Sequence, residues 1–221
     1  MTRLTAADRA TVAVTLLIVA AGVWIFLAGP LEVMPYHYGA DGQADAWAGR
    51  EAIGGGIVVL GLLTGVFAGG MGAAAARAED RARARALRSG QVLILLTFLG
   101  LTLFSGVSSL TDLTSLGSAV PMAGLAALFL LIGAVLGRVG PNPLAGVRTP
   151  WSYKSRLAWD RSNRLAGRLF FLIGLVGLAA APVAPQPLGY QLLIGAVVAA
   201  ALLSVIESWR VWRTDPDRQP F

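Results

Sequence analysis

Six long apolar runs constrain the fold of this chain more than any other feature of its sequence. They lie at about residues 11–29, 53–75, 91–111, 119–137, 167–184 and 188–208. Each is long enough to cross roughly 30 Å of hydrocarbon as a helix. Backbone polar groups in lipid must be hydrogen-bonded within their own segment, so each run is expected to form a transmembrane helix. The sequence therefore predicts an all-α polytopic membrane protein with six transmembrane helices.

The composition agrees with a membrane location. Of the 221 residues, 56% are hydrophobic and only 14% are charged, too few to solvate the surface of a soluble domain of this size. The lipid bilayer is therefore an expected partner. The formal net charge is +6, but the positive-inside rule predicts excess arginine in any multi-span protein, so no nucleic-acid partner is expected. Without cysteines, the chain has neither disulfides nor thiolate metal sites.

The basic residues are distributed unevenly among the connections. Seventeen of the eighteen Lys and Arg residues lie in the N-terminus, the connections 76–90 and 138–168, and the C-terminal tail; Arg50 is the exception. Because these segments share one side of the membrane, and cytoplasmic segments carry excess Lys and Arg, the N- and C-termini are predicted to be cytoplasmic. A cleaved signal peptide ending near Ala28 is the alternative for the first run. An even number of spans, however, accounts for the charge of every loop.

Two further patterns concern the helices. The first of these basic connections alternates Ala with Arg and acidic residues, which predicts a cytoplasmic extension of the second or third helix that meets anionic lipid headgroups. Small residues recur at helix-packing spacing at Gly61, Gly65 and Gly69 in the second run and at Gly133 and Gly137 in the fourth. This spacing suits close helix contact, either within the bundle or between the subunits of a homo-oligomer.

The outer loop, residues 31–51, has a net charge of −3 and holds the only histidine of the chain. Pro35 and the aromatic residues after it suggest a short extended segment, and the Asp-Gly pair that follows is a turn signal. His37, Asp41 and Asp45 are weak candidates for a metal site, since imidazole and carboxylate together suit zinc. The alternative is an Asx-turn and a hydrogen-bonded histidine in an ordered loop.

The inner connection contains a segment that a helix interior cannot accommodate. Residues 140–151 hold three prolines and two glycines. The prolines restrain the backbone on both sides of Arg148, so its guanidinium is expected to be held in a fixed position that suits a carboxylate or a phosphate. Beyond it, aromatic and basic residues alternate from Trp151 to Arg164, a pattern that suits an amphipathic helix on the inner leaflet. The alternative is a connector whose Arg and Trp side chains only satisfy lipid headgroups.

Both loops resemble parts of known families. The run 142–151, Asn-Pro-Leu-Ala-Gly-Val-Arg-Thr-Pro-Trp, resembles the signature of the SdpI family of bacterial immunity proteins. The resemblance continues at Trp159, Asn163 and Gly167. The segment 34–45 of the outer loop is similar to the Pro-x-His-(aromatic) and Gly-x-x-Asp pattern of an uncharacterised N-terminal domain often fused to that family. Together the two resemblances organise nearly the whole chain.

The resemblance implies a polytopic protein of the bacterial cytoplasmic (inner) membrane. The best-known relative protects a producing cell from a secreted toxic peptide and also holds a transcriptional repressor at the membrane. Two parts are then expected: an N-terminal hairpin, residues 1–75, with an ordered extracellular loop, and an SdpI-like four-helix part, residues 76–221, with a cytoplasmic motif loop at 138–168. The expected binding residues are Asn142, Arg148, Thr149, Trp151, Trp159, Asn163, His37, Asp41 and Asp45.

We therefore expect a multi-pass protein that confers toxin resistance by binding, with a secreted peptide as partner outside and a cytoplasmic regulator or lipid inside. The first alternative is a transporter of a small or apolar ligand, although the six runs hold no ionisable residue near their centres, where coupled carriers usually place one. The second is an enzyme that acts on lipid-linked or envelope substrates through His37 and a nearby Asp outside, or Arg148 inside. No nucleophile–base pair stands out, so binding is favoured over catalysis and no cofactor is predicted.

Overall fold

The structure, a computed structural model, describes residues 4–110, 119–142 and 144–220. Within these ranges the elements are α1 (Ala6–Ala28), β1 (Val33–Tyr38), β2 (Ala44–Gly49), α2 (Arg50–Ala76), α3 (Arg81–Leu110), α4 (Ala119–Leu136), α5 (Pro150–Lys154), α6 (Arg156–Ala180) and α7 (Leu188–Thr214). All the helices except α5, six in the described part of the chain, are long and apolar enough to cross a membrane. The predicted six-span helical membrane fold is confirmed. The predicted end of the third span, residue 111, lies outside the described residues.

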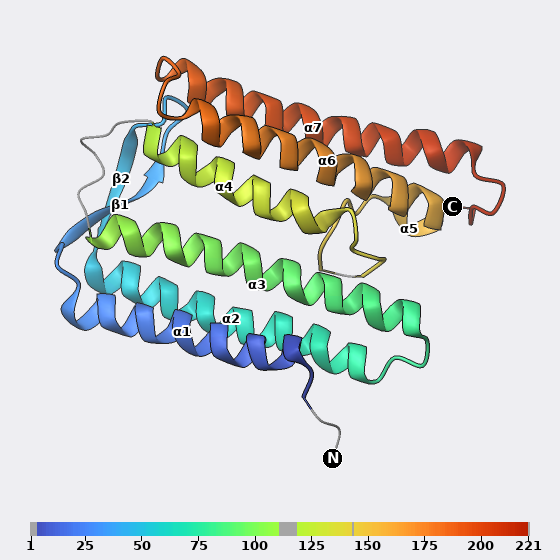
Figure 1. The fold of residues 1–221 in the computed structure, drawn as a ribbon, viewed down its shortest axis with the longest axis horizontal. Helices are drawn as coiled ribbons and strands as arrows, with labels where there is room; N and C mark the ends of the chain where they lie inside the picture. The colour runs from blue at the N-terminus through green and yellow to red at the C-terminus, as the bar shows by residue number, and fades with distance from the viewer. Residues whose placement is uncertain (1–3, 111–118, 143, 221) are drawn as a thin grey trace.

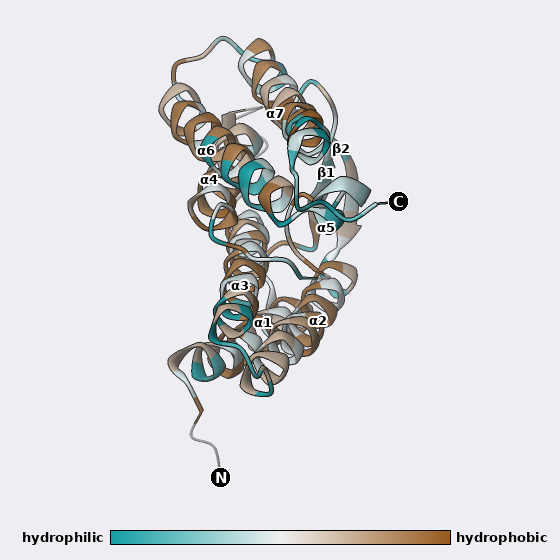
Figure 2. Cartoon of the chain, turned by 90° about the vertical axis from the view of Figure 1, so that its right-hand side faces the viewer, coloured by the Kyte–Doolittle hydropathy of each residue, from teal (hydrophilic) through white to brown (hydrophobic). Residues whose placement is uncertain are grey.

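The long helices lie side by side in two halves (Figure 1). α1, α2 and α3 form one half, and α4, α6 and α7 form the other, with α3 against α4. The start of α1, the end of α7, the α2–α3 connection and α5 lie toward one end of the bundle, whereas β1 and β2 lie at the other (Figure 1). The end of the bundle near α5 is called the basic end below, because it holds the arginines of 77–88 and the segment 138–168. Hydrophilic residues gather there on α6 and the C-terminal tail (Figure 2). The assignment of the basic end to the cytoplasm stays a prediction.

Glycines allow the helices within each half to approach closely. A Cβ atom built on Gly133 of α4 would lie 2.2 Å from the backbone nitrogen of Phe171 in α6. One built on Gly54 of α2 would lie 2.5 Å from the backbone nitrogen of Phe26 in α1. Any side chain at these positions would push the helices apart, so the two helix pairs depend on glycine where they meet.

The predicted small-residue contacts are confirmed only in part. Gly133 lies in a tight contact, and a Cβ on Gly61 would lie 2.7 Å from the Val19 side chain. Gly65 and Gly137 are less tightly enclosed, with nearest atoms at 3.3 and 3.4 Å. A Cβ on Gly69 would meet no described atom within 4 Å. Helical spacing alone therefore did not distinguish a glycine at a helix contact from one on an open surface.

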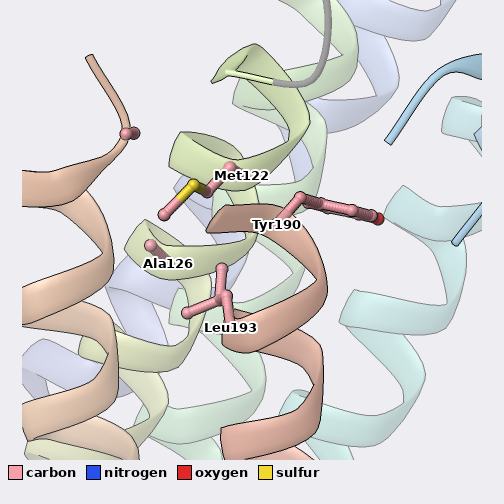
Figure 3. Packing of buried hydrophobic residues seen from close by; sticks show 5 residues of the cluster. Met122, Ala126, Tyr190 and Leu193 are labelled. Atoms are coloured by element: carbon pink, nitrogen blue, oxygen red, sulfur yellow. The ribbon is translucent and has the colours of Figure 1, made fainter. Parts of the chain in front are cut away.

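An apolar cluster joins α4 to α7 near the end that carries the sheet (Figure 3). Met122 and Ala126 of α4 lie beside Leu193 of α7, and all three side chains are buried. Tyr190 of α7 belongs to the same cluster, but its ring extends away from Met122 (Figure 3). This packing holds the two helices together at the end of the bundle opposite α5.

A polar network joins α1 to α3 at the basic end. Arg88 of α3 pairs with Asp8 of α1, and the two side chains are only 23% and 20% exposed. The same guanidinium donates to Gln91 Oε1 (2.8 Å), and the Nε2 of the fully buried Gln91 donates to Thr11 Oγ1 (2.8 Å). A Cβ on Gly72 of α2 would lie 2.6 Å from Asp8 Oδ1. The network therefore occupies space that only a glycine on α2 leaves open.

The start of α3 confirms the predicted helical extension of the α2–α3 connection. Asp80 accepts hydrogen bonds from the backbone N–H groups of Ala82 (3.0 Å) and Arg83 (2.9 Å). These are amide groups of the first turn, which have no partner within the helix. The two bonds hold the pKa of the Asp80 carboxyl below its ordinary value. α3 thus begins ten residues before its predicted apolar run, within the arginine-rich segment.

α6 begins much earlier than the predicted span at 167–184. Its first residue is Arg156, and Ser155 caps it by accepting a hydrogen bond from the Ala158 N–H (2.9 Å). The first turns of the helix carry charged residues on one face, so they do not form a continuous apolar run. A prediction based on apolar runs alone cannot include such turns.

This early start changes two predictions about the inner connection. Residues 156–168 are helical, so the predicted motif loop 138–168 is correspondingly shorter. The amphipathic helix predicted from Trp151 to Arg164 is instead divided between the short α5 and the first turns of α6. The two pieces are separated at Ser155, where the backbone is extended.

Candidate functional site

The segment between α4 and α6, residues 137–155, is called the motif loop below, and Asn142 closes its first turn. Its buried side chain donates from Nδ2 to the carbonyls of Gly140 (2.9 Å) and Ala145 (2.8 Å). Its Oδ1 accepts from the N–H groups of Leu144 (2.8 Å) and Ala145 (2.7 Å). These four bonds use the full capacity of the amide. Asn142 therefore shapes the loop from within.

Two side chains from α6 hold the middle of the motif loop. Trp159 is fully buried, and its Nε1 donates to the Val139 carbonyl (2.7 Å). Asn163, also buried, accepts the Val147 N–H at Oδ1 (2.8 Å) and donates from Nδ2 to the Trp159 carbonyl (2.9 Å). Buried backbone groups need such partners, because leaving them unpaired costs free energy. The two residues thus attach an irregular backbone to a regular helix.

Thr149 attaches the motif loop to α7. It is the N-cap of α5, with its Oγ1 accepting from the Ser152 N–H (3.0 Å) while Ser152 Oγ lies 2.9 Å from the Thr149 nitrogen. The same Thr149 hydroxyl lies 2.8 Å from the Ser208 hydroxyl of α7, and all three residues are buried. One side chain therefore both starts α5 and joins it to the last helix.

The C-terminal tail lies against α5 and the start of α6. Ser155 donates from Oγ to Asp215 Oδ2 (2.5 Å), and both side chains are buried. The Gln219 N–H donates to the Lys154 carbonyl (2.8 Å). A buried carboxylate is costly unless it is hydrogen-bonded, and this serine supplies a bond. The tail is thus a structural part of the motif loop region.

Sequence reasoning missed several of these residues. A signal for α5 existed, since Thr149 is followed by a proline at the first helical position and by Ser152 three residues on, a typical capping pattern. Ser208 and Asp215 carried no comparable signal. Each is far from the motif loop in sequence, so the relation depends on how α7 and the tail pack.

The backbone at Gly146 requires glycine for two reasons. Its φ angle is +124°, a conformation that L side chains rarely adopt. In addition, a Cβ at this position would lie 2.7 Å from Asn163 Oδ1 and 2.9 Å from the Trp159 ring. The glycine therefore lets the loop approach α6 closely enough for the Val147 to Asn163 hydrogen bond.

We expect Gly146→Ala to lower the free energy of unfolding by about 2 kcal/mol, because the change adds left-handed backbone strain and displaces the Asn163 amide. The matched control is Gly195→Ala on α7, where a Cβ would meet no described atom within 4 Å. Unfolding in mixed detergent micelles measures the free energy of unfolding of both variants. Equal stability of the two variants would contradict the close packing of the loop on α6.

Arg148 and Trp151 differ from the other predicted residues of the motif loop. Arg148 is exposed and lines a cleft of about 650 Å³ between the two halves of the bundle. Trp151 is half-buried on α5. The neighbouring backbone is fixed on both sides of Arg148, by Asn163 at Val147 and by Ser152 at Thr149. The loop thus presents this arginine from a restrained backbone.

The outer loop forms an antiparallel hairpin of β1 and β2. His37 Nδ1 lies 2.6 Å from Asp45 Oδ1, with both side chains more than half exposed. Asp41 Oδ1 accepts the Gln43 N–H (3.0 Å), which is an Asx-turn. Tyr38 packs edge-on against Phe104 of α3, and burial raises the pKa of its hydroxyl. The hairpin is therefore ordered. It contains the Asx-turn and the hydrogen-bonded histidine that were predicted as the alternative to a metal site.

The hairpin brings together only part of a metal ligand set. Zinc sites use three or four protein ligands, and no group of three or more His, Cys, Asp or Glu side chains suited to a metal occurs among the described residues. His37 and Asp45 supply two such groups. The metal hypothesis therefore still needs a further ligand from elsewhere.

The predicted binding residues thus form two groups at opposite ends of the bundle (Figure 1). The hairpin group comprises His37, Asp41 and Asp45, and the motif loop group comprises Asn142, Arg148, Thr149, Trp151, Trp159 and Asn163. The length of the transmembrane helices lies between them. Ligand binding by either group stays a prediction.

Comparison with protein families gives a match that includes the motif loop group. Residues 138–208 match the model of the SdpI/YfhL protein family. The chain carries an SdpI/YfhL family region. No curated protein and no solved structure matches the chain. The resemblance of the motif to the SdpI family is therefore confirmed, and the protein is a multi-pass membrane protein with an SdpI segment.

The SdpI segment, residues 138–208, corresponds to a connected unit of the structure. It begins at the first residues of the motif loop, includes α5 and α6, and ends in α7 at Ser208. Ser208 is the residue whose hydroxyl contacts Thr149. The family match therefore includes both sides of the contact that attaches the motif loop to α7.

Proposed function

We propose that this membrane protein is an immunity-type protein that confers resistance to a secreted peptide by binding. The observation that carries the proposal is the SdpI segment at residues 138–208. Inside this segment, the polar atoms of Asn142 and Asn163 bond the protein's own backbone. Their arrangement supports a framework role in a binding protein rather than a role in proton transfer.

The hairpin is the proposed contact for the peptide. It belongs to a loop with a net charge of −3, and its acidic residues include the exposed Glu32, Asp41 and Asp45. Such a surface attracts a cationic peptide, although salt limits the attraction to about 10 Å. The positive-inside rule supports an extracellular location for this end of the bundle.

The motif loop is the proposed contact on the cytoplasmic side. Its backbone is fixed by α6 and by the caps of α5, and it carries the exposed Arg148. An arginine on a restrained backbone loses less conformational entropy when it binds a carboxylate or phosphate than one on a flexible loop. This chemistry suits an acidic group, either on a cytoplasmic regulator or on a lipid headgroup.

The proposal is tested by expressing the protein in a bacterium that is sensitive to a secreted cationic peptide toxin. Wild-type protein should raise survival, and Asp41→Asn combined with Glu32→Gln should lower that protection at least about threefold by weakening electrostatic attraction. Asparagine at position 41 retains the Asx-turn, so the hairpin shape is preserved.

The matched control is Glu79→Gln, which removes one exposed acidic charge at the opposite end of the bundle. It should protect as well as wild type. Unchanged killing of cells that hold correctly inserted wild-type protein, over a panel of such peptides, would contradict the immunity function. Equal protection by wild type and the hairpin variant would instead remove the hairpin from the peptide contact.

A further inference from the structure

The cleft beside the motif loop lies between the two halves of the bundle. Its volume is about 650 Å³, within the range of roughly 300–1,000 Å³ that is typical of ligand sites. Phe67 of α2 and Phe98 of α3 line it from one half, and Phe170 of α6 lines it from the other. Residues 144–149 of the motif loop border the cleft at the basic end.

The polarity of the cleft is asymmetric. Among the described residues that line it, Arg148 is the only ionisable one. Two of the lining hydroxyls are engaged within the protein: Thr149 Oγ1 contacts Ser208 (2.8 Å), and Ser204 Oγ donates to the Ala200 carbonyl (2.7 Å). A ligand here would therefore meet one cation at the basic end and mainly hydrocarbon elsewhere.

The cleft is open toward the side of the bundle. Phe67 on α2 and Val205 on α7 are each 37% exposed, and Leu144 of the motif loop is 38% exposed. These residues lie within or next to membrane-spanning helices, where the surroundings are lipid rather than water. A ligand can therefore enter from the bilayer, and its tail need not cross water.

The cleft is short along the helix axes but is bordered by residues of α2, α3, α4, α6 and α7. Its lining residues on α3 run from Leu93 to Phe98, which corresponds to a rise of about 7.5 Å along the helix. Those on α7 run from Ala201 to Val205, a rise of about 6 Å. A single extended tail would use little of the width. A glycerol unit with the upper parts of two acyl chains suits this shape better.

We propose that the cleft binds an anionic phospholipid, with its phosphate on Arg148 and the first part of its acyl chains between α2, α3 and α7. A phosphate group and a guanidinium form charge-assisted hydrogen bonds, and the restrained loop places this guanidinium at the end where the basic residues gather. The lipid site does not depend on the peptide role of the hairpin, which lies at the other end of the bundle.

Native mass spectrometry of the purified, delipidated protein tests the proposal. Wild-type protein should bind phosphatidylglycerol more tightly than diacylglycerol with the same chains. Arg148→Ala should lower the affinity for phosphatidylglycerol about tenfold and leave the affinity for diacylglycerol unchanged, because only the headgroup contact is lost. Ala201→Phe, which places an aromatic ring on the side of the cleft formed by α7, should lower the affinity for both lipids.

The matched control is Arg161→Ala, which removes an exposed positive charge of α6 that does not line the cleft. It should bind both lipids as wild type does. Wild-type affinity of Arg148→Ala and Ala201→Phe for phosphatidylglycerol would overturn the proposal. Full displacement of phosphatidylglycerol by inorganic phosphate would also overturn it, since the acyl chains would then contribute nothing.

Discussion

Trp159→Ala is expected to lower the free energy of unfolding by about 4 kcal/mol, among the largest effects of any single change in the SdpI segment. The side chain is fully buried beneath the motif loop. Its loss would leave a cavity next to Gly146 and remove the 2.7 Å hydrogen bond from its indole nitrogen to the Val139 carbonyl. The stability of a detergent-solubilised sample, measured by unfolding in mixed micelles, provides the test.

Trp209→Ala is the matched control for this change. Trp209 lies on α7, is 40% exposed and stacks with Arg213, whose guanidinium carbon is 4.8 Å from the ring centroid. Its truncation removes surface contacts without opening an internal cavity, so the expected loss is only about 1 kcal/mol. If both tryptophan variants lost the same stability, Trp159 would not be the residue that supports the motif loop.

The sequence predicted the helices well because lipid imposes a strict requirement on the backbone. Each long apolar run had to become a helix, and each did within the described residues. The start of α6 was not predicted, since Arg156 and the charged residues after it interrupt the apolar run. The strand β2 was also missed, because its sequence Ala-Asp-Ala-Trp-Ala-Gly has weak strand propensity, and only pairing with β1 makes it a strand.

The candidate site was predicted as a set of residues, but their contacts were not. The motif correctly directed attention to Asn142, Trp159 and Asn163, and the structure brings them together around the motif loop. Residue type alone does not show whether an asparagine binds a ligand or the protein backbone. Here the amides of both asparagines bond the backbone, and that could be seen only after the loop was placed on α6.

The largest effect in the other half is expected at the pair formed by Asp8 and Arg88. Replacement of either partner, Asp8→Asn or Arg88→Gln, should lower the free energy of unfolding by about 3 kcal/mol, because it leaves the other charge poorly compensated within a largely buried network. Gln91 contacts Arg88 and Thr11, so the damage should extend along the network. Unfolding in mixed micelles measures each variant.

A double-mutant cycle distinguishes this pairing from unrelated damage at two positions. Because the second replacement removes the charge that the first leaves unpaired, the double variant should be more stable than additivity predicts by at least about 1 kcal/mol. The control cycle uses Arg156 and Asp160, an ion pair on α6 whose side chains are 63% and 32% exposed. Water and salt screen such a pair, so its coupling energy should not exceed about 0.5 kcal/mol. Equal coupling energies in the two cycles would show that burial contributes nothing to the interaction between α1 and α3.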